Sequence, residues 1–188
     1  MRARGCGRER RGMSRGTIAG AITWGGAAGL LGTAVMDLVI VGFFAAVRMP
    51  PGLVYSFIGD VAQQFFLRIG VAVSGGVLLG ALVHFGLGLA LGAVFGVAVS
   101  RVKRLRLGSV AKGALLGVFY IEIVSQPILV SAPLLVTMSA PDVLQWYVLS
   151  TAMHLIYGIV LGVVLALRQR WLARVAQQGI DRRSATSF

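Results

Sequence analysis

Four long, nearly uncharged stretches dominate this sequence and restrict what it can fold into. They run over residues 20–47, 71–99, 110–132 and 147–167. A helix of about 20 mostly apolar residues suffices to cross the hydrocarbon core of a bilayer. Only 13% of the residues are charged and the mean hydropathy is +0.85, whereas about a quarter of the residues of a soluble domain are charged. We therefore predict an all-α integral membrane bundle of four transmembrane helices, forming one domain over residues 20–167.

The distribution of basic residues predicts how the chain lies in the membrane. Of 18 Lys and Arg, 16 precede the first stretch, lie between the second and third, or follow the fourth; only Arg48 and Arg68 lie in the other two loops. Because cytoplasmic loops carry an excess of Lys and Arg, both termini are expected in the cytoplasm, as basic tails over residues 1–19 and 168–188. This topology accounts for the net charge of +12 and favours contact with anionic lipid headgroups over nucleic-acid binding.

The first stretch is expected to be retained rather than cleaved as a signal peptide. The apolar region of a signal peptide has about 7–15 residues, whereas this stretch is longer and contains Asp37. Residues 1–12 are rich in Arg and Gly and show no structural pattern, so Met13 is an alternative start. Cys6 lies in this tail, and a single cysteine supports neither a disulfide nor a thiolate metal site.

The loop after the first stretch is predicted to contain a helix of its own. Leu53, Phe57, Val61 and Phe65 recur at steps of four after a Pro-Pro turn, with polar residues elsewhere around the wheel. This pattern predicts an amphipathic helix near residues 53–66 that lies in the outer membrane interface. The alternative is that these residues extend the second span outward.

Glycines recur at steps of four on several of the predicted spans. Residues four apart share one helix face, and helices in lipid associate through close backbone packing at small residues. We predict that these glycines lie on faces buried against other helices: Gly76, Gly80, Gly88, Gly92, Gly96, Gly158 and Gly162. A similar stripe on the first span is formed by Gly25, Gly29, Thr33 and Asp37.

The two halves of the chain show a short internal repeat. His84 and His154 each begin the pattern H-x3-G-x3-G, and Gly32 and Gly117 each lie five residues before an acidic residue. Each half therefore consists of an acid-bearing helix, an outer loop and a histidine-bearing helix. We predict a 2+2 parallel duplication about an axis along the membrane normal.

The spans also contain polar residues. Ionisable side chains within a membrane are rare and almost always face the interior of the bundle. We expect a common mid-membrane centre formed by Asp37, His84, Glu122, Gln126 and His154. Pro127, next to Gln126, is expected to break the hydrogen-bond ladder of its helix and to free backbone carbonyls.

Three functions are compatible with such a centre. The first is an accessory or structural membrane component, in which carboxylate–histidine pairs hold helices together at about 0.6 kcal/mol each. The second is a carrier of protons or metal cations, since histidine titrates near neutrality and two acids with two imidazoles form a plausible ligand set for a divalent metal. The third is a b-type haem protein with His84 and His154 as axial ligands.

No sequence motif predicts an enzyme. The chain has no HExxH, GxSxG, P-loop or CxxC motif, and its glycine-rich runs lie inside the spans rather than after strands. Among the three functions, the accessory or structural role is favoured, within a homodimer or a larger membrane complex.

The segment "GTAVMDLVIVGFF", followed by "MPPG" and by an H-x3-G-x3-G helix, resembles small four-helix membrane proteins of bacteria and archaea. These are known mainly as domains of unknown function and include the YagU-like type. The resemblance covers residues 20–167. It implies a four-helix fold in the prokaryotic cytoplasmic membrane, and it implies no substrate and no catalytic residue.

Overall fold

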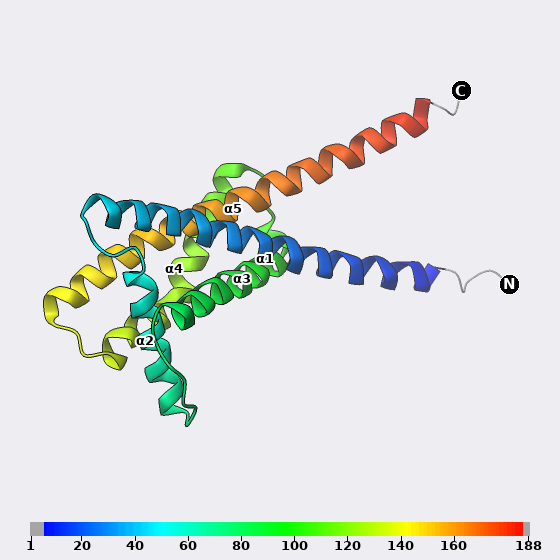
Figure 1. Ribbon diagram of the computed structural model, residues 1–188. Helices are drawn as coiled ribbons and strands as arrows, with labels where there is room; N and C mark the ends of the chain where they lie inside the picture. The colour runs from blue at the N-terminus through cyan, green and yellow to red at the C-terminus, as the bar shows by residue number, and fades with distance from the viewer. Residues whose placement is uncertain (1–5, 186–188) are drawn as a thin grey trace.

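The computed structural model is all-helical (Figure 1). It describes the backbone of residues 6–185, with side-chain burial and contacts for residues 18–102, 104–175 and 177–178. The elements are α1 (Cys6–Ala46), α2 (Leu53–Arg68), α3 (Val77–Arg101), the short 3-10 helix η1 (Lys103–Leu105), α4 (Val110–Leu135) and α5 (Ala140–Ala185). Residues 6–185 contain no strand, so the all-α prediction is confirmed for this part of the chain.

Four of the helices are long and apolar enough to cross a membrane, as predicted. These segments are Ile18–Ala46, Val77–Arg101, Val110–Leu135 and Ala140–Val175. The boundaries differ in places: α3 begins at Val77 because residues 69–76 form a loop, and α5 continues to Ala185, into the predicted basic tail over residues 168–188. No proline interrupts residues 168–185, which are rich in the good helix formers Arg, Gln and Ala.

The bundle is built from two helix pairs. α1 packs along α3 and α4 packs along α5, and the backbones of the two pairs approach mainly where α1 contacts α5. α3 and α4 contact each other through Tyr120, whose hydroxyl donates to the Leu91 carbonyl at 2.9 Å and whose ring lies against Phe95. Both chain ends lie on the same side of the bundle (Figure 1), as an even number of crossings requires. The basic connector before α4 belongs to this side too, because the Leu107 N–H donates to Gln169 Oε1 on α5 at 3.2 Å.

The helix predicted in the loop after the first span is α2. A loop separates it from α3, so α2 does not extend α3 outward. α2 folds back against α3. Gly59 and Ala62 are its buried residues, whereas Leu53 and Phe65 of the predicted apolar stripe are exposed. The two ends of the stripe are therefore exposed, whereas Phe57 in its middle packs against Trp146 of α5, with ring centroids 4.7 Å apart. A different face of α2, with Gly59 and Ala62, makes the contact with α3.

Glycines allow the helix backbones in each pair to approach closely. A Cβ on Gly92 would meet the Gly25 carbonyl oxygen and would lie 2.7 Å from Gly29 Cα. In the second pair, a Cβ on Gly162 would meet the Gly113 carbonyl oxygen. These contacts are of the small-residue kind expected between membrane helices.

The glycines predicted to form one stripe on α3 do not all contact the same helix. Gly80 packs against Tyr55 of α2 rather than against α1. Gly76 precedes α3, has a φ of +87°, and would place a Cβ in open space. Its backbone still packs on α2, because a Cβ on Gly59 would meet the Gly76 carbonyl oxygen. Glycine suits position 76 because the left-handed region is unfavourable for other residues.

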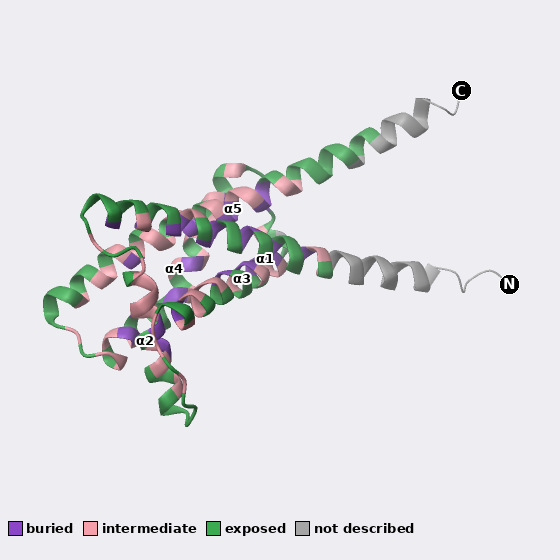
Figure 2. Ribbon diagram, in the orientation of Figure 1, coloured by how far each residue is buried: buried purple, intermediate pink, exposed green. Residues whose placement is uncertain are grey.

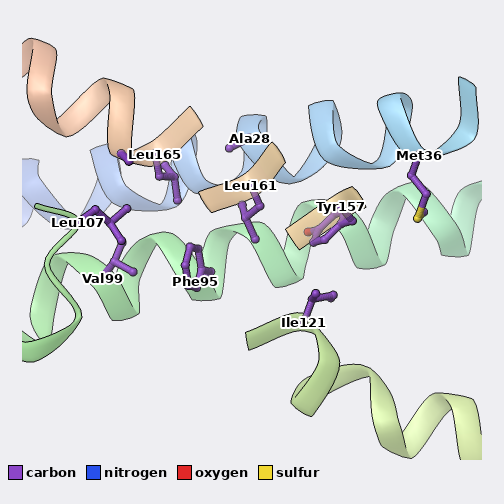
Figure 3. Close-up of a cluster of buried hydrophobic side chains, with 10 residues drawn as sticks. Ala28, Met36, Phe95, Val99, Leu107, Ile121, Tyr157, Leu161 and Leu165 are labelled. Atoms are coloured by element: carbon purple, nitrogen blue, oxygen red, sulfur yellow. The ribbon is translucent and has the colours of Figure 1, made fainter. Parts of the chain in front are cut away.

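Buried and exposed residues both occur along the spanning helices (Figure 2), and large apolar residues are found among both. A buried cluster, drawn in Figure 3, joins α1, α3, α4, α5 and the connector through Ala28, Met36, Phe95, Val99, Leu107, Ile121, Tyr157, Leu161, Leu165 and Ala166. On the outside, Leu38 and Leu78 are each 75% exposed. An extensive apolar exterior of this kind marks a surface made for a membrane or a partner rather than for water.

α4 continues as one helix through Pro127 and Pro133, so neither proline ends it. Because proline has no N–H, Pro133 leaves the carbonyl four residues earlier, that of Leu129, without its helical donor. The Trp146 indole Nε1 of α5 donates to this carbonyl at 3.2 Å. Neighbouring helices supply the missing donor in this way in membrane proteins, where prolines are tolerated within helices.

We expect Trp146→Phe to lower the free energy of unfolding by about 1–3 kcal/mol, because the buried Leu129 carbonyl loses its donor. In a Pro133→Ala background the residue 133 N–H can take over, so the same change should cost clearly less. Denaturant titration in mixed micelles measures both costs. Equal costs in the two backgrounds would show that the indole bond does not compensate for the proline.

Candidate functional site

A cavity of ≈ 150 Å³ lies inside the bundle and is lined by residues from all five α-helices. Met36, Ile121 and Tyr157, which lie at one end of the cluster in Figure 3, border it. Most of its lining is apolar, and its polar members are Thr33, Asp37, His84, Ser125, Ser150, His154 and Tyr157. Mostly apolar walls with a few converging polar groups are typical of binding sites in proteins.

The Asp37 carboxylate is the centre of a three-helix hydrogen-bonded cluster. His84 Nε2 on α3 lies 2.8 Å from Asp37 Oδ1. The Tyr55 hydroxyl on α2 donates to Asp37 Oδ2 at 2.6 Å. The Asp37 residue is only 7% exposed, so both carboxylate oxygens are satisfied within the protein.

The glycine packing of α1 and α3 positions this pair. Gly29 of α1 meets the Gly88 carbonyl of α3. Asp37 lies two turns beyond Gly29, His84 lies one turn before Gly88, and the two helices run in opposite directions, so both side chains lie to the same side of the contact. The Thr33 hydroxyl, which lies between them, donates to the Gly29 carbonyl at 3.1 Å and needs no further partner.

Tyr55 acts as a hydrogen-bond donor in this cluster. Burial and the adjacent Asp37 carboxylate both raise the pKa of Tyr55 above its usual value. The phenol therefore keeps its proton and stabilises the carboxylate. Its ring also meets the His84 ring edge-on, with centroids 5.9 Å apart, and so restricts the position of the imidazole.

The opposite wall of the cavity, formed by α4 and α5, has unused hydrogen-bonding groups. His154 Nδ1 and Ser125 Oγ are both buried, and neither has a partner among the described residues. Ser150, one turn before His154, also lines the cavity. Buried polar groups are normally paired, so these two groups indicate that something polar belongs in the cavity.

The contacts between α4 and α5 repeat those between α1 and α3. The residues that correspond in the two pairs differ from the predicted ones. Gly29 meets the carbonyl of Gly88, and Gly117 meets the carbonyl of Gly158. Eight residues beyond Gly29 is Asp37, and eight residues beyond Gly117 is Ser125. Ser125, rather than Glu122, thus takes the place of Asp37 in the second pair.

The predicted match between Gly32 and Gly117 is therefore wrong by three residues. Gly32 faces Tyr157 of α5, whose Cδ2 would lie 3.0 Å from an added Cβ. Three residues are almost one helical turn, so the sequence pattern alone cannot distinguish the two registers. The repeated contacts are consistent with an internal duplication, which stays a prediction.

Three of the five predicted centre residues line the cavity: Asp37, His84 and His154. Glu122 and Gln126 do not; Gln126 is exposed and Glu122 is partly exposed. The buried face of α4 contains Gly113, Gly117, Ile121, Ser125 and Leu129 at steps of four. Glu122 and Gln126 each follow a member of this face by one residue, and a step of one residue turns a side chain by about 100° around the helix.

The sequence did not single out Tyr55, Tyr157 or Ser125 as part of the site. The Tyr157 hydroxyl donates to the Gly88 carbonyl at 2.8 Å and links α5 to α3. Its position three residues after His154 is a signal that places both on one face. Tyr55 gave no such signal, because its partner depends on how α2 folds back against α3.

Metal binding and haem binding at this centre stay predictions. Among the residues whose side chains the structure describes, no three or more His, Cys, Asp or Glu come together as a metal-binding group. His84 Nε2 is already bonded to Asp37. The cavity, at ≈ 150 Å³, is below the roughly 300–1,000 Å³ typical of small-molecule and cofactor pockets.

Comparisons with protein-family models, curated proteins and solved structures return no match for this chain. The resemblance to small four-helix membrane proteins therefore stays a prediction. The function has to be inferred from the geometry of the cavity and of the Asp37 cluster.

Proposed function

We propose that this chain is a multi-pass membrane protein that binds and releases a proton at the Asp37–His84 pair. The observation that carries this proposal is a buried carboxylate–imidazole pair that shares a cavity with unpartnered polar atoms of His154 and Ser125. A purely structural contact would leave no polar group of the cavity unsatisfied. A few water molecules would satisfy these atoms and would connect them to the pair.

In the proposed chemistry, the Asp37 carboxylate and the His84 imidazole share one proton. The 2.8 Å contact between Asp37 Oδ1 and His84 Nε2 is short enough for this proton to be shared or transferred. Tyr55 keeps its own proton and donates to the other carboxylate oxygen. His154, on the opposite wall, supplies an unpartnered ring nitrogen as the next acceptor. Losing the shared proton leaves an uncompensated charge in apolar surroundings, which is costly, so proton exchange should change the packing of the three helices.

We propose that the proton enters from the side of the membrane that carries α2. His84 is seven residues after the start of α3 at Val77 and 17 residues before its end at Arg101. At a rise of 1.5 Å per residue these separations are about 10 Å and about 25 Å. The longer path crosses the glycine contacts of α1 and α3 and the cluster in Figure 3, so it is the closed side.

The positive-inside distribution completes this proposal. With the chain proposed to lie in the prokaryotic cytoplasmic membrane, this distribution supports both termini and the connector before α4 in the cytoplasm, where their basic residues would contact anionic lipids. The open side of the cavity then faces outward. A proton taken up there would report the external pH to the membrane domain.

Infrared spectroscopy of the protein in lipid nanodiscs tests the proposal. We expect a protonated-carboxyl C=O band that titrates with the pH of the medium and disappears in Asp37→Asn. Glu122→Gln is the matched control, because it removes another carboxyl of the spans that does not line the cavity, and the band should persist. Circular dichroism and elution profiles establish that both variants fold. A band that titrates unchanged in Asp37→Asn would rule out this pair as the proton site.

The second candidate function is an accessory or structural role. It is favoured by the complete pairing of both Asp37 oxygens, which ties α1 to α2 and α3. In that case the infrared band of the Asp37 carboxyl should not change with pH, whereas Asp37→Asn should still lower the stability of the bundle. The same experiment therefore separates the two functions.

A further inference from the structure

One flank of α4 carries polar side chains where a spanning helix crosses the middle of the membrane. Glu122 lies at the midpoint of α4 (Val110–Leu135), and Gln126 lies one turn further on. Gln126 is exposed, and no side chain that the structure describes is hydrogen-bonded to it. Glu122 is partly exposed, and its Oε1 is buried without a partner among the described residues. Polar groups facing lipid are unfavourable because the hydrocarbon offers no hydrogen bonds.

The surrounding residues form a surface suited to another helix. Leu115, Phe119, Glu122 and Gln126 follow one another at steps of four, three and four, the spacing of a seam between two helices. Leu115 is 61% exposed and Phe119 is 63% exposed. α4 uses its other face, with Gly113 and Gly117, to pack on α5. We call the set of Leu115, Phe119, Glu122 and Gln126, of which Glu122 is only partly exposed, the α4 seam.

We propose that the α4 seam binds the α4 seam of a second copy of this chain, around a two-fold axis. An amide both donates and accepts hydrogen bonds, and a protonated carboxyl does the same. The seam is therefore complementary to itself, and a two-fold axis brings identical patches together. It carries no Lys or Arg, so it does not repel its own copy as a basic surface would.

The other polar groups of the spans favour a second copy over a different region of this chain. Asp37, His84 and His154 line the cavity and are turned to the inside of the bundle. They are not available to an approaching helix. Within the described spans, the groups best placed to satisfy Gln126 are therefore those of the same seam. This interface is separate from the cavity and does not depend on the proposed proton function.

Cysteine cross-linking of the full chain in liposomes tests this interface. In a Cys6→Ser background, which removes the single native cysteine, Phe119→Cys should give a disulfide-linked dimer under mild oxidation. Leu38→Cys on α1, a residue that is 75% exposed, is the matched control and should stay monomeric. The association constant, measured by energy transfer between labelled copies, should fall about 5- to 30-fold in Gln126→Leu and stay unchanged in Gln64→Leu on α2.

The outcomes separate the possibilities. Cross-linking through Phe119→Cys together with weaker association in Gln126→Leu supports the dimer. A monomer at every protein-to-lipid ratio overturns the proposal, as does equal cross-linking through Leu38→Cys. Association that is unchanged in Gln126→Leu also overturns it. If the purified chain instead carries a different membrane protein that is lost in Gln126→Leu, the seam binds a heterologous helix and the second copy is the wrong occupant.

Discussion

Asp37→Ala is expected to lower the free energy of unfolding by about 3–5 kcal/mol, the range found when one partner of a buried ion pair is removed. The change removes the acceptor of both the Tyr55 hydroxyl and His84 Nε2. Both groups then stay desolvated without a partner, which is more costly than the net value of the bonds themselves. Denaturant titration in mixed micelles measures the loss. Glu122→Ala, which leaves the cavity intact, is the control and should cost much less.

A double-mutant cycle shows whether the effect belongs to the pair. Once His84→Ala has removed the imidazole, Asp37→Ala should cost less, and we expect a coupling free energy of about 0.5–3 kcal/mol. Tyr55→Phe should also couple to Asp37→Ala, whereas Glu122→Ala should not. Additivity within about 0.5 kcal/mol for both Asp37 pairs would contradict a shared hydrogen-bonded centre.

Gly92→Ala is the second change for which we expect a large loss, of about 1–3 kcal/mol, as is typical of overpacking. The new Cβ would meet the Gly25 carbonyl oxygen and the Gly29 backbone. Backbone atoms of this kind cannot move aside as the end of a flexible side chain can, so α1 and α3 have to separate. Because the same contacts position His84 against Asp37, the variant should also weaken that bond, which the infrared band of Asp37 would report.

Gly86→Ala, in the same helix, is the matched control for this prediction. An added Cβ at Gly86 meets nothing within 4 Å, and alanine is the better helix former by about 1 kcal/mol. We expect Gly86→Ala to be neutral or slightly stabilising. Thermal unfolding in detergent compares the two variants under identical conditions. Similar losses would mean that glycine acts through helix flexibility rather than through close packing.

Local features of the chain were predictable because each depends on a short segment. The four spans follow from apolar length, and α2 follows from periodicity after a Pro-Pro turn. The start of α5 at Ala140, which lies before the predicted start of the fourth span at residue 147, is also determined locally. Ser139 precedes the helix and exchanges hydrogen bonds with Asp142, the third helical residue, which is a capping box.

The candidate site was predictable in part. Asp37, His84 and His154 share helix faces with glycines. Because these glycine faces are buried, side chains on the same faces point into the bundle. Glu122 was grouped with them because it is also an acid within a span. Its own helix, however, buries the face that contains Ile121 and Ser125, and one residue of rotation is enough to turn Glu122 out of the cavity.

The sequence by itself determined which segments are helices, which of their faces are small, and which polar residues lie on those faces, because the helical repeat is a property of each segment alone. Only the tertiary structure decided that Asp37 pairs with His84 and Tyr55, and that Ser125 takes the corresponding place on α4. These pairings depend on the axial shift between helices and on how α2 folds back. Both are set by contacts between residues far apart in the chain, such as Gly29 with Gly88, and a one-turn shift leaves the periodic pattern of each helix unchanged.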